Sequence, residues 1–199
     1  MSFLSRCFQP TQADRPLLER DRADHDPRLL NDSSTKAPNC IFCNVTPEKF
    51  NVVLEDEEFI AFKDRSPASL HHLLVIPRIH IDNVNSLTRK DVALLKGMHA
   101  FGERALDLIS SEPADGRGKQ DGQRRFGFHI PPFRSVEHLH LHSQALPYKS
   151  WIRSMKYRVV EPNSDARARG YHKGWTWFVE VGQACDILKD GGRIKVGAC

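Results

Sequence analysis

The sequence predicts an α+β fold, with one long helix packed on one face of a mostly antiparallel sheet. Three observations lead to this prediction: short apolar segments separated by turn residues, one long segment with apolar residues at helical spacing, and a histidine-leucine alternation over residues 138–142. Alternation with period two is typical of a strand that buries one face, and spacing near 3.6 residues is typical of an amphipathic helix.

The composition is that of a globular protein with one core. The chain has 199 residues, of which 40% are hydrophobic and 27% are charged, and these values are ordinary for one folded domain. No apolar run approaches the roughly 20 residues that a membrane helix needs, so we expect neither a transmembrane segment nor a membrane partner. The net charge of +4 suits an anionic ligand but does not distinguish a nucleotide from a nucleic acid.

The chain is expected to divide into a disordered N-terminal tail at 1–38, a folded domain at 39–147 and a C-terminal extension at 148–199 packed on that domain. The tail is rich in charges and has no apolar stretch that could serve as a secretory signal. The tail has at least as many acidic residues as arginines, whereas a mitochondrial presequence is poor in acidic residues. Five cysteines, an odd number, favour a reducing compartment, and we expect a cytoplasmic or nuclear location, or both.

The first expected strands form a hairpin and a central strand. Apolar residues around Val53 and over 59–62 flank an acidic turn at 55–58, which predicts a hairpin. After a turn-rich loop, the continuous apolar run 73–76 ends at Pro77. A short continuous run of this kind is consistent with a buried strand.

A long helix is expected to begin at Thr88. Thr88 and Asp91 have the spacing of a capping box, with aspartate where glutamate or glutamine is usual. The apolar residues that follow form one stripe, which should cover one face of the sheet. They are Val92, Leu95, Met98, Ala105, Leu106 and Ile109.

Two further strands and a C-terminal helix complete the expected order. The segment 111–125, with its glycines, proline and charges, is expected to be a surface loop. Strands are expected at 126–130 and 138–144, separated by a Pro-Pro turn. In the extension we expect a short strand at 175–179 and a helix at 181–189 that ends at a Gly-Gly pair.

The segment 138–142, His-Leu-His-Leu-His, is the most informative part of the sequence. In a strand, its three histidines point to one face while its two leucines point into the core. Imidazoles titrate near neutral pH, so neighbouring rings can divide the roles of nucleophile, proton donor and ligand orienter. A neutral imidazole that attacks phosphorus needs its far nitrogen bonded to an acceptor, such as a backbone carbonyl. By itself the pattern is also compatible with adventitious metal binding or a solvated surface.

Three separated blocks agree in order and spacing with a known family over roughly half of the chain. They are Cys40-Ile41-Phe42-Cys43, the upstream pair Phe62-Lys63-Asp64 and Leu74-Val75-Ile76-Pro77-Arg78-Ile79-His80, and the final Ser135-Val136-Glu137-His138-Leu139-His140-Leu141-His142. The chain resembles the histidine-triad (HIT) family, and within it the Hint branch of adenosine 5'-monophosphoramidases. Residues 128–133 are most similar to the third type of that branch. The resemblance implies a HIT-like fold.

The resemblance also implies a reaction. A nucleotide hydrolase of this family cleaves the P–N bond of adenosine 5'-phosphoramidates through a covalent adenylyl-histidine and releases AMP and an amine. His140 would be the nucleophile, while His142 and Ser135 would contact the phosphate and help to protonate the leaving amine. Because phosphoryl transfer depends mainly on positioning and charge stabilisation, we expect no magnesium requirement.

The nucleotide-binding residues follow from the same resemblance. Asp64 would hold the ribose hydroxyls. Arg65 stands where the family more often has an apolar residue, and His129 stands where small Hint proteins tend to carry asparagine near the ribose and phosphate. The full expected set is Asp64, Arg65, His129, Ser135, His140 and His142. The expected partner is an adenine nucleotide, and dimerisation through the long helix, usual in the family, is implied as well.

The cysteine pair predicts one half of a zinc site. Cys40 and Cys43 have metal-ligand spacing, and a closed tetrahedral site needs two further ligands. The resemblance implies that His80 and His138 complete a structural zinc site that fastens the N-terminal segment to the strand bearing His140. The alternative is that both cysteines are small buried hydrophobes. The adjacent histidines at 71–72 are expected to be strand-edge or core residues rather than ligands.

Two other functions remain open at this point. An aprataxin-like enzyme would use the same triad to remove adenylyl groups from nucleic-acid 5' ends, and the pair at 143–144 is similar to the Ser-Gln found there. That branch adds a C-terminal zinc finger, and the two cysteines after Cys43 are too far apart to form one, so a nucleic-acid partner is not expected. A non-catalytic nucleotide-binding protein is the other alternative.

Overall fold

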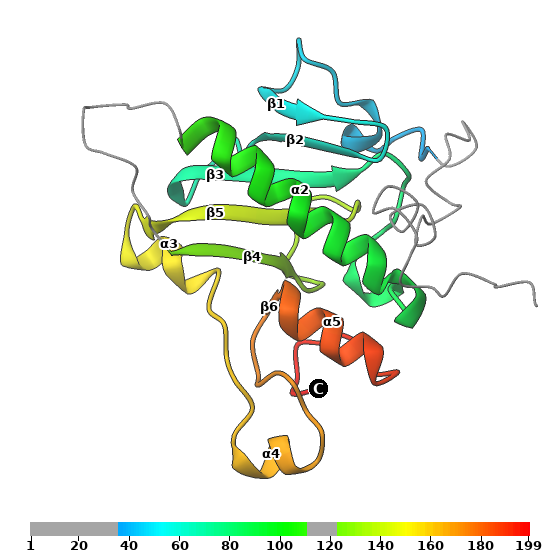
Figure 1. The fold of residues 1–199 in the computed structure, drawn as a ribbon, viewed down its shortest axis with the longest axis vertical. Helices are drawn as coiled ribbons and strands as arrows, with labels where there is room; N and C mark the ends of the chain where they lie inside the picture. Colours follow the sequence, from blue (N-terminus) through cyan, green and yellow to red (C-terminus); the bar gives the residue numbers. More distant parts are fainter. Residues whose placement is uncertain (1–35, 111–122) are drawn as a thin grey trace, which may run out of the picture.

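Six strands form one antiparallel sheet in the order β1-β2-β3-β5-β4-β6 (Figure 1). The computed structural model describes residues 36–110 and 123–199. The strands are β1 (Val52–Glu55), β2 (Phe59–Lys63), β3 (Ser69–Pro77), β4 (Arg124–His129), β5 (Leu141–Tyr148) and β6 (Phe178–Glu180). With the long helix on one face, this arrangement confirms the predicted α+β class.

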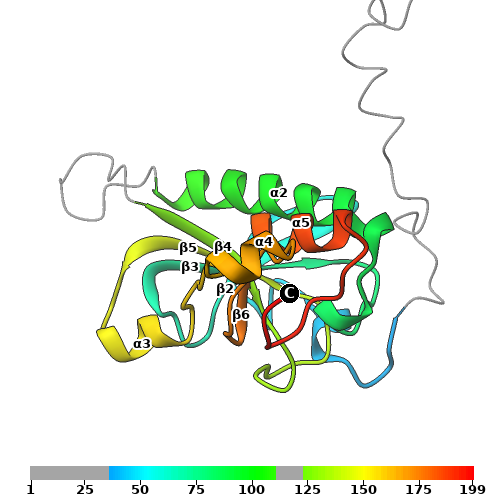
Figure 2. The same ribbon diagram turned by 90° about the horizontal axis from the view of Figure 1, so that it is seen from below.

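The helix α2 (Val92–Ser110) crosses one face of the sheet, and α5 (Val181–Lys189) lies beside it on the same face (Figure 2). The predicted capping box is confirmed: the Asp91 carboxylate accepts hydrogen bonds from the Thr88 backbone N–H at 2.7 Å and from its hydroxyl at 2.9 Å. A 3-10 turn, η6 (Arg89–Asp91), precedes the α-helix proper. No helix within the described ranges is long and apolar enough to cross a membrane.

The main core lies between the sheet and α2, and the helix approaches the sheet closely there. A Cβ atom on Gly102 would lie 2.5 Å from the Ser143 Oγ of β5, so a larger residue at this helix position would push the layers apart. The core includes Leu73, Val75 and Leu141, which alternate with residues of the opposite face. A smaller apolar cluster on that opposite face contains Phe42, Ile60, Phe62, Leu74 and Ile76.

The chain after β5 completes the sheet. It forms α3 (Trp151–Met155) and α4 (Ser164–Ala168), and then β6, which pairs with β4 through Val179 and Phe128. The predicted helix 181–189 is confirmed, whereas the strand predicted at 175–179 lies at 178–180. The fully buried Lys173 fastens the C-terminal residues, because its ammonium donates to the carbonyls of Gly174, Val196 and Gly197.

Three predicted boundaries are wrong. The strand predicted at 138–144 begins at Leu141, because the preceding residues bond to the loop after β3: the Leu139 N–H donates to the Ile81 carbonyl at 2.6 Å. The strand predicted at 126–130 begins at Arg124, inside the predicted loop, since Arg124 and Arg125 pair with β5. The strand predicted at 73–76 extends over nine residues.

Some predicted segments lie outside the described residues. Almost all of the predicted tail 1–38 and the greater part of the predicted loop 111–125 lie there. The division into a domain at 39–147 and an extension at 148–199 stays a prediction, although the extension contributes β6 to the sheet and α5 to the α2 face.

Candidate active site

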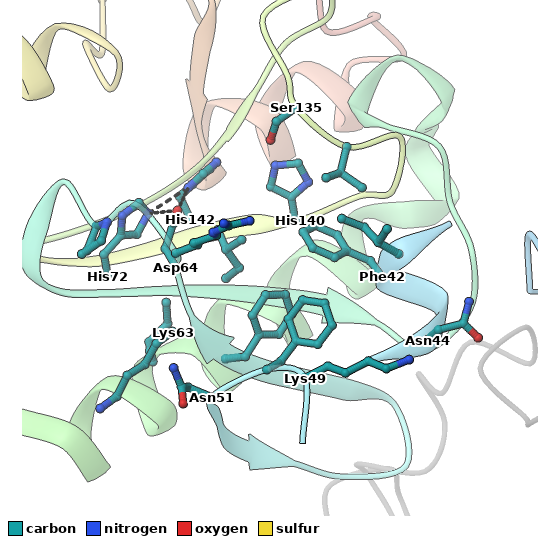
Figure 3. Close-up of a pocket in the computed structure, with 18 of the residues that line it drawn as sticks. Phe42, Asn44, Lys49, Asn51, Lys63, Asp64, His72, Ser135, His140 and His142 are labelled. Carbon is teal, nitrogen blue, oxygen red and sulfur yellow. Dashed lines mark hydrogen bonds and ion pairs between the residues drawn. The ribbon is translucent and has the colours of Figure 1, made fainter. Parts of the chain in front are cut away.

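A pocket opens on the face of the sheet opposite α2, and it brings together most of the predicted site residues (Figure 3). The pocket has an open volume of about 1460 Å³, which is ample for a small-molecule ligand. The predicted catalytic and nucleotide-binding residues that line it are Asp64, Arg65, Ser135, His140 and His142, and the predicted metal ligand Cys40 lines it as well. His129 is not among the lining residues; it lies behind His142 and contacts that ring.

His140 lines the pocket, and among the described residues one nitrogen of its ring has no hydrogen-bond partner. Its Nδ1 lies 2.7 Å from the backbone carbonyl oxygen of His138, and because a carbonyl can only accept, Nδ1 carries the proton and Nε2 keeps its lone pair. Burial lowers the pKa of His140, so the ring is neutral at pH 7. The edge of Phe42 packs against the ring at 5.6 Å between centroids. The result is a neutral, oriented imidazole whose Nε2 lone pair is available.

His142 belongs to a chain of three imidazoles whose protons can be assigned in turn. The His129 Nε2 donates to the Lys156 carbonyl at 3.0 Å, which leaves its Nδ1 as an acceptor. The His142 Nε2 therefore donates to that Nδ1 at 2.9 Å, and the His142 Nδ1 in turn accepts from the His72 Nε2 at 2.9 Å. The His72 Nδ1 accepts from the Ala68 backbone N–H at 3.1 Å. All three rings are thus neutral Nε2–H tautomers.

Burial keeps this chain uncharged. It lowers the pKa of His72 and of His129 to about 4, with like-charge repulsion from neighbouring groups as a smaller cause. The pKa of the buried His142 is lowered well below its ordinary value, first by burial and then by the charges of His129 and His72. At pH 7 the three imidazoles are therefore neutral, and each carries one ring proton that takes part in a hydrogen bond.

His72 is the site residue that sequence reasoning missed. We expected a core or strand-edge residue, and the ring is indeed buried, yet it bonds to His142 and lies 3.4 Å from the Asp64 Oδ2. The sequence feature that could have revealed His72 is its position in β3, where alternation places it on the same face as Leu74 and Ile76. The pairing of Leu74 with His142 across the sheet, which brings the two histidines together, is a tertiary fact.

Asp64 turns its two oxygens in different directions. Oδ1 accepts from the Ser66 backbone N–H at 2.7 Å, which holds the side chain in place. Oδ2 faces His72 and, at 3.9 Å, the Nδ1 of His142 (Figure 3). The carboxylate therefore borders both the pocket and the histidine chain, a second contact that the sequence did not predict.

The loop before the triad is tied down by polar contacts. Arg134 and Glu137 form an ion pair, and the Glu137 carboxylate also accepts from the Asn83 side chain at 2.6 Å. Ser135 lies between these residues in the sequence and lines the pocket, and Figure 3 shows its hydroxyl directed toward the His140 ring. The loop thereby holds a hydroxyl group beside His140.

The four predicted metal ligands lie together next to the pocket. The ligand atoms of Cys40, Cys43, His80 and His138 are all within 4.8 Å of one another. The His138 Nδ1 lies 3.4 Å from the Cys40 Sγ, and the His80 Nδ1 lies 3.3 Å from the Cys43 Sγ, close to the edge of about 3.6 Å expected for a tetrahedral zinc site.

The outer nitrogens of both histidines are also bonded as a metal site requires. The His138 Nε2 donates to the Pro77 carbonyl and the His80 Nε2 to the Asp82 carboxylate, both at 3.0 Å. Each Nδ1 therefore carries a lone pair directed at the cysteines. Burial raises the pKa of the Cys43 thiol, and a bound cation would reverse that shift. The residues fit zinc.

Comparison with known proteins places the chain in a family. The family described as "Scavenger mRNA decapping enzyme C-term binding" matches residues 39–158. A Danio rerio protein named adenosine 5'-monophosphoramidase HINT3 is 38% identical over 156 residues, covering 76% of this chain and 83% of that protein. The chain belongs to the histidine-triad family.

Other histidine-triad relatives carry different names. The Arabidopsis thaliana protein named bifunctional adenosine 5'-phosphosulfate phosphorylase/adenylylsulfatase HINT4 is 40% identical over 127 residues, which cover 62% of this chain and 81% of that protein. Aprataxin of Gallus gallus is 37% identical over 149 residues, which cover 72% of this chain and 39% of aprataxin. Within the family, the likeness therefore extends to proteins named for several substrates.

Proposed function

We propose that this protein hydrolyses the P–N bond of adenosine 5'-phosphoramidates and releases AMP and an amine through a covalent adenylyl group on His140. The observation that carries the proposal is the state of His140: Nδ1–H donates to the His138 carbonyl, and the bare Nε2 faces the pocket. The name of the 38% identical relative, adenosine 5'-monophosphoramidase, supports the same reaction class.

The reaction has two steps. In the first, the His140 Nε2 lone pair forms a bond to the α-phosphorus, the P–N bond breaks, and its electron pair leaves on the amine nitrogen. The amine takes up a proton that originates in solvent and is delivered through His142 or Ser135, both of which line the pocket. In the second step, water attacks the phosphorus, the bond to Nε2 breaks, and the proton lost by water returns to solvent.

Recognition of the nucleotide is assigned to the pocket beside the nucleophile. Asp64 would bind the ribose hydroxyls, and the Arg65 guanidinium at the pocket wall would add positive charge near the phosphate or ribose. His129 would act on the phosphate through His142, which it contacts. The apolar lining from Phe42 and Phe62 suits the flat face of a base.

The test of the nucleophile is His140→Ala, assayed on an adenosine 5'-phosphoramidate. Loss of a nucleophile that acts together with its partners should lower kcat by about 10⁴-fold or more. Mass spectrometry of quenched wild-type protein should find an adenylyl adduct on the peptide that contains His140. His172→Ala is the matched control, because His172 pairs with Asp190 far from the triad segment. Full activity of H140A, or an adduct on another residue, would contradict the proposal.

A second candidate function is removal of adenylyl groups from nucleic-acid 5' ends. The observation that favours it is the 37% identity with aprataxin over 72% of this chain. Faster AMP release from 5'-adenylylated DNA than from the phosphoramidate would select this function. Tight AMP binding without turnover of either compound would instead indicate a nucleotide-binding protein that is not an enzyme.

We propose a structural role for zinc and none for magnesium. Cys40, Cys43, His80 and His138 would hold zinc, which would supply rigidity to the segment that precedes His140. Activity of the zinc-loaded protein should persist after brief treatment with EDTA in magnesium-free buffer. Complete and immediate loss that only magnesium restores would contradict this.

Two properties of the whole protein are also proposed. A homodimer through α2 would use the outer face of that helix, where Lys96, Glu103 and Arg104 are exposed; light scattering in solution tests it, and a monomer at all concentrations would contradict it. A cytoplasmic or nuclear location rests on the cysteine pair, and microscopy of the tagged chain tests it.

A further inference from the structure

We propose that Tyr157, together with the backbone carbonyl of Lys156, positions the chain of three histidines formed by His72, His129 and His142. The Tyr157 ring holds these imidazoles in one tautomeric arrangement. This inference rests on the proposed function for its kinetic readout only. Tyr157 lies after α3, beyond the motifs that predicted the site, and its ring is buried.

The ring of Tyr157 contacts every imidazole of the chain. Its centroid lies 5.5 Å from that of His72, 5.1 Å from that of His129 and 5.3 Å from that of His142. The interplanar angles of 89°, 54° and 69° are edge or tilted geometries, which aromatic pairs favour. One side chain therefore restricts the rotation of three rings.

Tyr157 is itself held rigidly on its other sides. Tyr148 stacks on it at 5.7 Å with an interplanar angle of 15°, and Phe178 of β6 packs edge-on at 5.4 Å. The Arg125 guanidinium donates to the Tyr157 carbonyl at 3.2 Å. Three strands of the sheet thereby support the position of this one ring.

The neighbouring residue determines the direction of the proton chain. The Lys156 carbonyl accepts from the His129 Nε2 at 3.0 Å and from the Trp177 Nε1 at 3.2 Å. Because that carbonyl can only accept, it sets the tautomer of His129, and through it those of His142 and His72. The segment 156–157 therefore determines both the orientation and the protonation pattern of the chain.

The ring, and not the hydroxyl, carries this role. Burial, and secondarily the charge of Asp64, raise the pKa of Tyr157, so the phenol stays protonated and neutral. A half-turn of an imidazole exchanges nitrogen for carbon positions and breaks both of its hydrogen bonds. Packing against the Tyr157 ring prevents that turn and excludes water that would offer other hydrogen-bond partners.

The experiment compares Tyr157→Leu with Tyr157→Phe. Tyr157→Leu removes the ring and should lower kcat by about a hundredfold, because small displacements of catalytic groups have effects of that size, while KM stays close to the wild-type value. Tyr157→Phe keeps the ring and should restore most of this loss. The matched control is Tyr171→Leu, since Tyr171 packs against Arg169 away from the histidines.

A second readout is independent of activity. Long-range ¹H–¹⁵N NMR of the imidazoles should show His72, His129 and His142 as single Nε2–H tautomers in the wild type and as mixtures in Tyr157→Leu. If the wild type proves inactive on the phosphoramidate, the proposed function fails, yet the NMR comparison still tests the positioning role. If Tyr157→Leu does not fold, Tyr148→Leu, which removes the stacking ring and also the hydroxyl that donates to the Gln144 Oε1 at 3.2 Å, should show the same tautomer change to a smaller degree, and Tyr148→Phe, which keeps the ring, should not.

Three results would overturn the inference. They are wild-type kcat in Tyr157→Leu, single Nε2–H tautomers in a folded variant that lacks the ring, and equal loss in Tyr157→Phe and Tyr157→Leu. The last result would assign the effect to the hydroxyl.

Discussion

Two clusters of imidazoles stand on either side of His140, and they differ in where their protons lie. The cluster of Cys40, Cys43, His80 and His138 and the group of Asp64, His72 and His142 both bring ligand atoms within 4.8 Å. In the first cluster, each histidine uses its outer Nε2–H on an oxygen, so lone pairs face the cysteines. In the second group, the facing nitrogens of His72 and His142 already share a proton.

The difference shows that proximity does not make a metal site. Zinc at the His72 Nε2 would require the proton of that ring to move to Nδ1, where the Ala68 N–H already points. The carbonyls and amides around each imidazole therefore decide which nitrogen keeps a lone pair: the Nδ1 of His138, which suits the proposed ligand, the Nε2 of His140, which suits the proposed nucleophile, and the Nδ1 of His142, which accepts a hydrogen bond within the histidine chain.

The largest expected effect is on zinc binding and stability in the cluster of Cys40, Cys43, His80 and His138. Cys43→Ser should abolish stoichiometric zinc binding and lower the stability by several kcal/mol, or roughly 10 °C in Tm, because a closed site loses one of four ligands. Metal analysis and thermal unfolding measure both. Cys199→Ser is the control and should keep its zinc; equal zinc content in both variants would remove the proposed site.

A change in the group of Asp64, His72 and His142 should lower activity without loss of zinc. His72→Phe keeps a ring beside Tyr157 but cannot donate to His142, so kcat on the phosphoramidate should fall by about 10²-fold at unchanged zinc content. His99→Phe, on the sheet side of α2 against Phe126, is the control. Zinc loss in His72→Phe would show that the two clusters are not independent.

A smaller effect is expected at the outer contact of the metal cluster. Asp82→Asn weakens the acceptor that orients His80 and should lower zinc affinity by about 10-fold or more, measured by competition with a chelating dye. Turnover at saturating zinc should be unchanged. Asp190→Asn changes the comparable His172 pair and should leave zinc affinity as it is. An unaltered affinity in D82N would argue against His80 as a ligand.

A separate effect is a pH dependence of stability. In the unfolded chain a histidine binds a proton below about pH 6.5, while burial lowers the folded-state pKa of His72 and His129 to about 4. The unfolded state binds more protons between these values, so the free energy of unfolding falls as the pH falls, by about 1.4 kcal/mol per pH unit for each ring. Above about pH 6.5 both rings are neutral in the folded and the unfolded state, so they no longer lower the free energy of unfolding.

Urea unfolding between pH 7 and pH 4.5 tests this dependence by comparison with His129→Gln. In the variant, the free energy of unfolding should fall less steeply with falling pH, by about 1.4 kcal/mol per pH unit, because the variant lacks one of the two rings. All other titrating groups are common to both proteins. An identical pH dependence would mean that His129 is not held neutral by burial.

Sequence reasoning predicted the elements best where one local pattern dominates. The capping box at Thr88 and the apolar stripe of α2 arise from neighbouring residues alone, and both are confirmed. Boundaries failed where non-local bonds compete with the local pattern, as at Leu139, whose N–H bonds to Ile81 and not to a strand. The predicted roles of the site residues stay predictions, although the structure brings five of the six predicted nucleotide-binding residues to one pocket and the four predicted metal ligands together beside it.

By itself, the sequence determined the type of chemistry. The alternation over 138–142 directs three imidazoles to one face and two leucines to the core, because side chains of an extended chain alternate. Only the tertiary structure decided what each imidazole does. His72 reaches His142 through the pairing of β3 with β5, and Tyr157 covers both from a segment after α3. An imidazole's proton is placed by its hydrogen-bond partners, and most of those partners are distant in sequence.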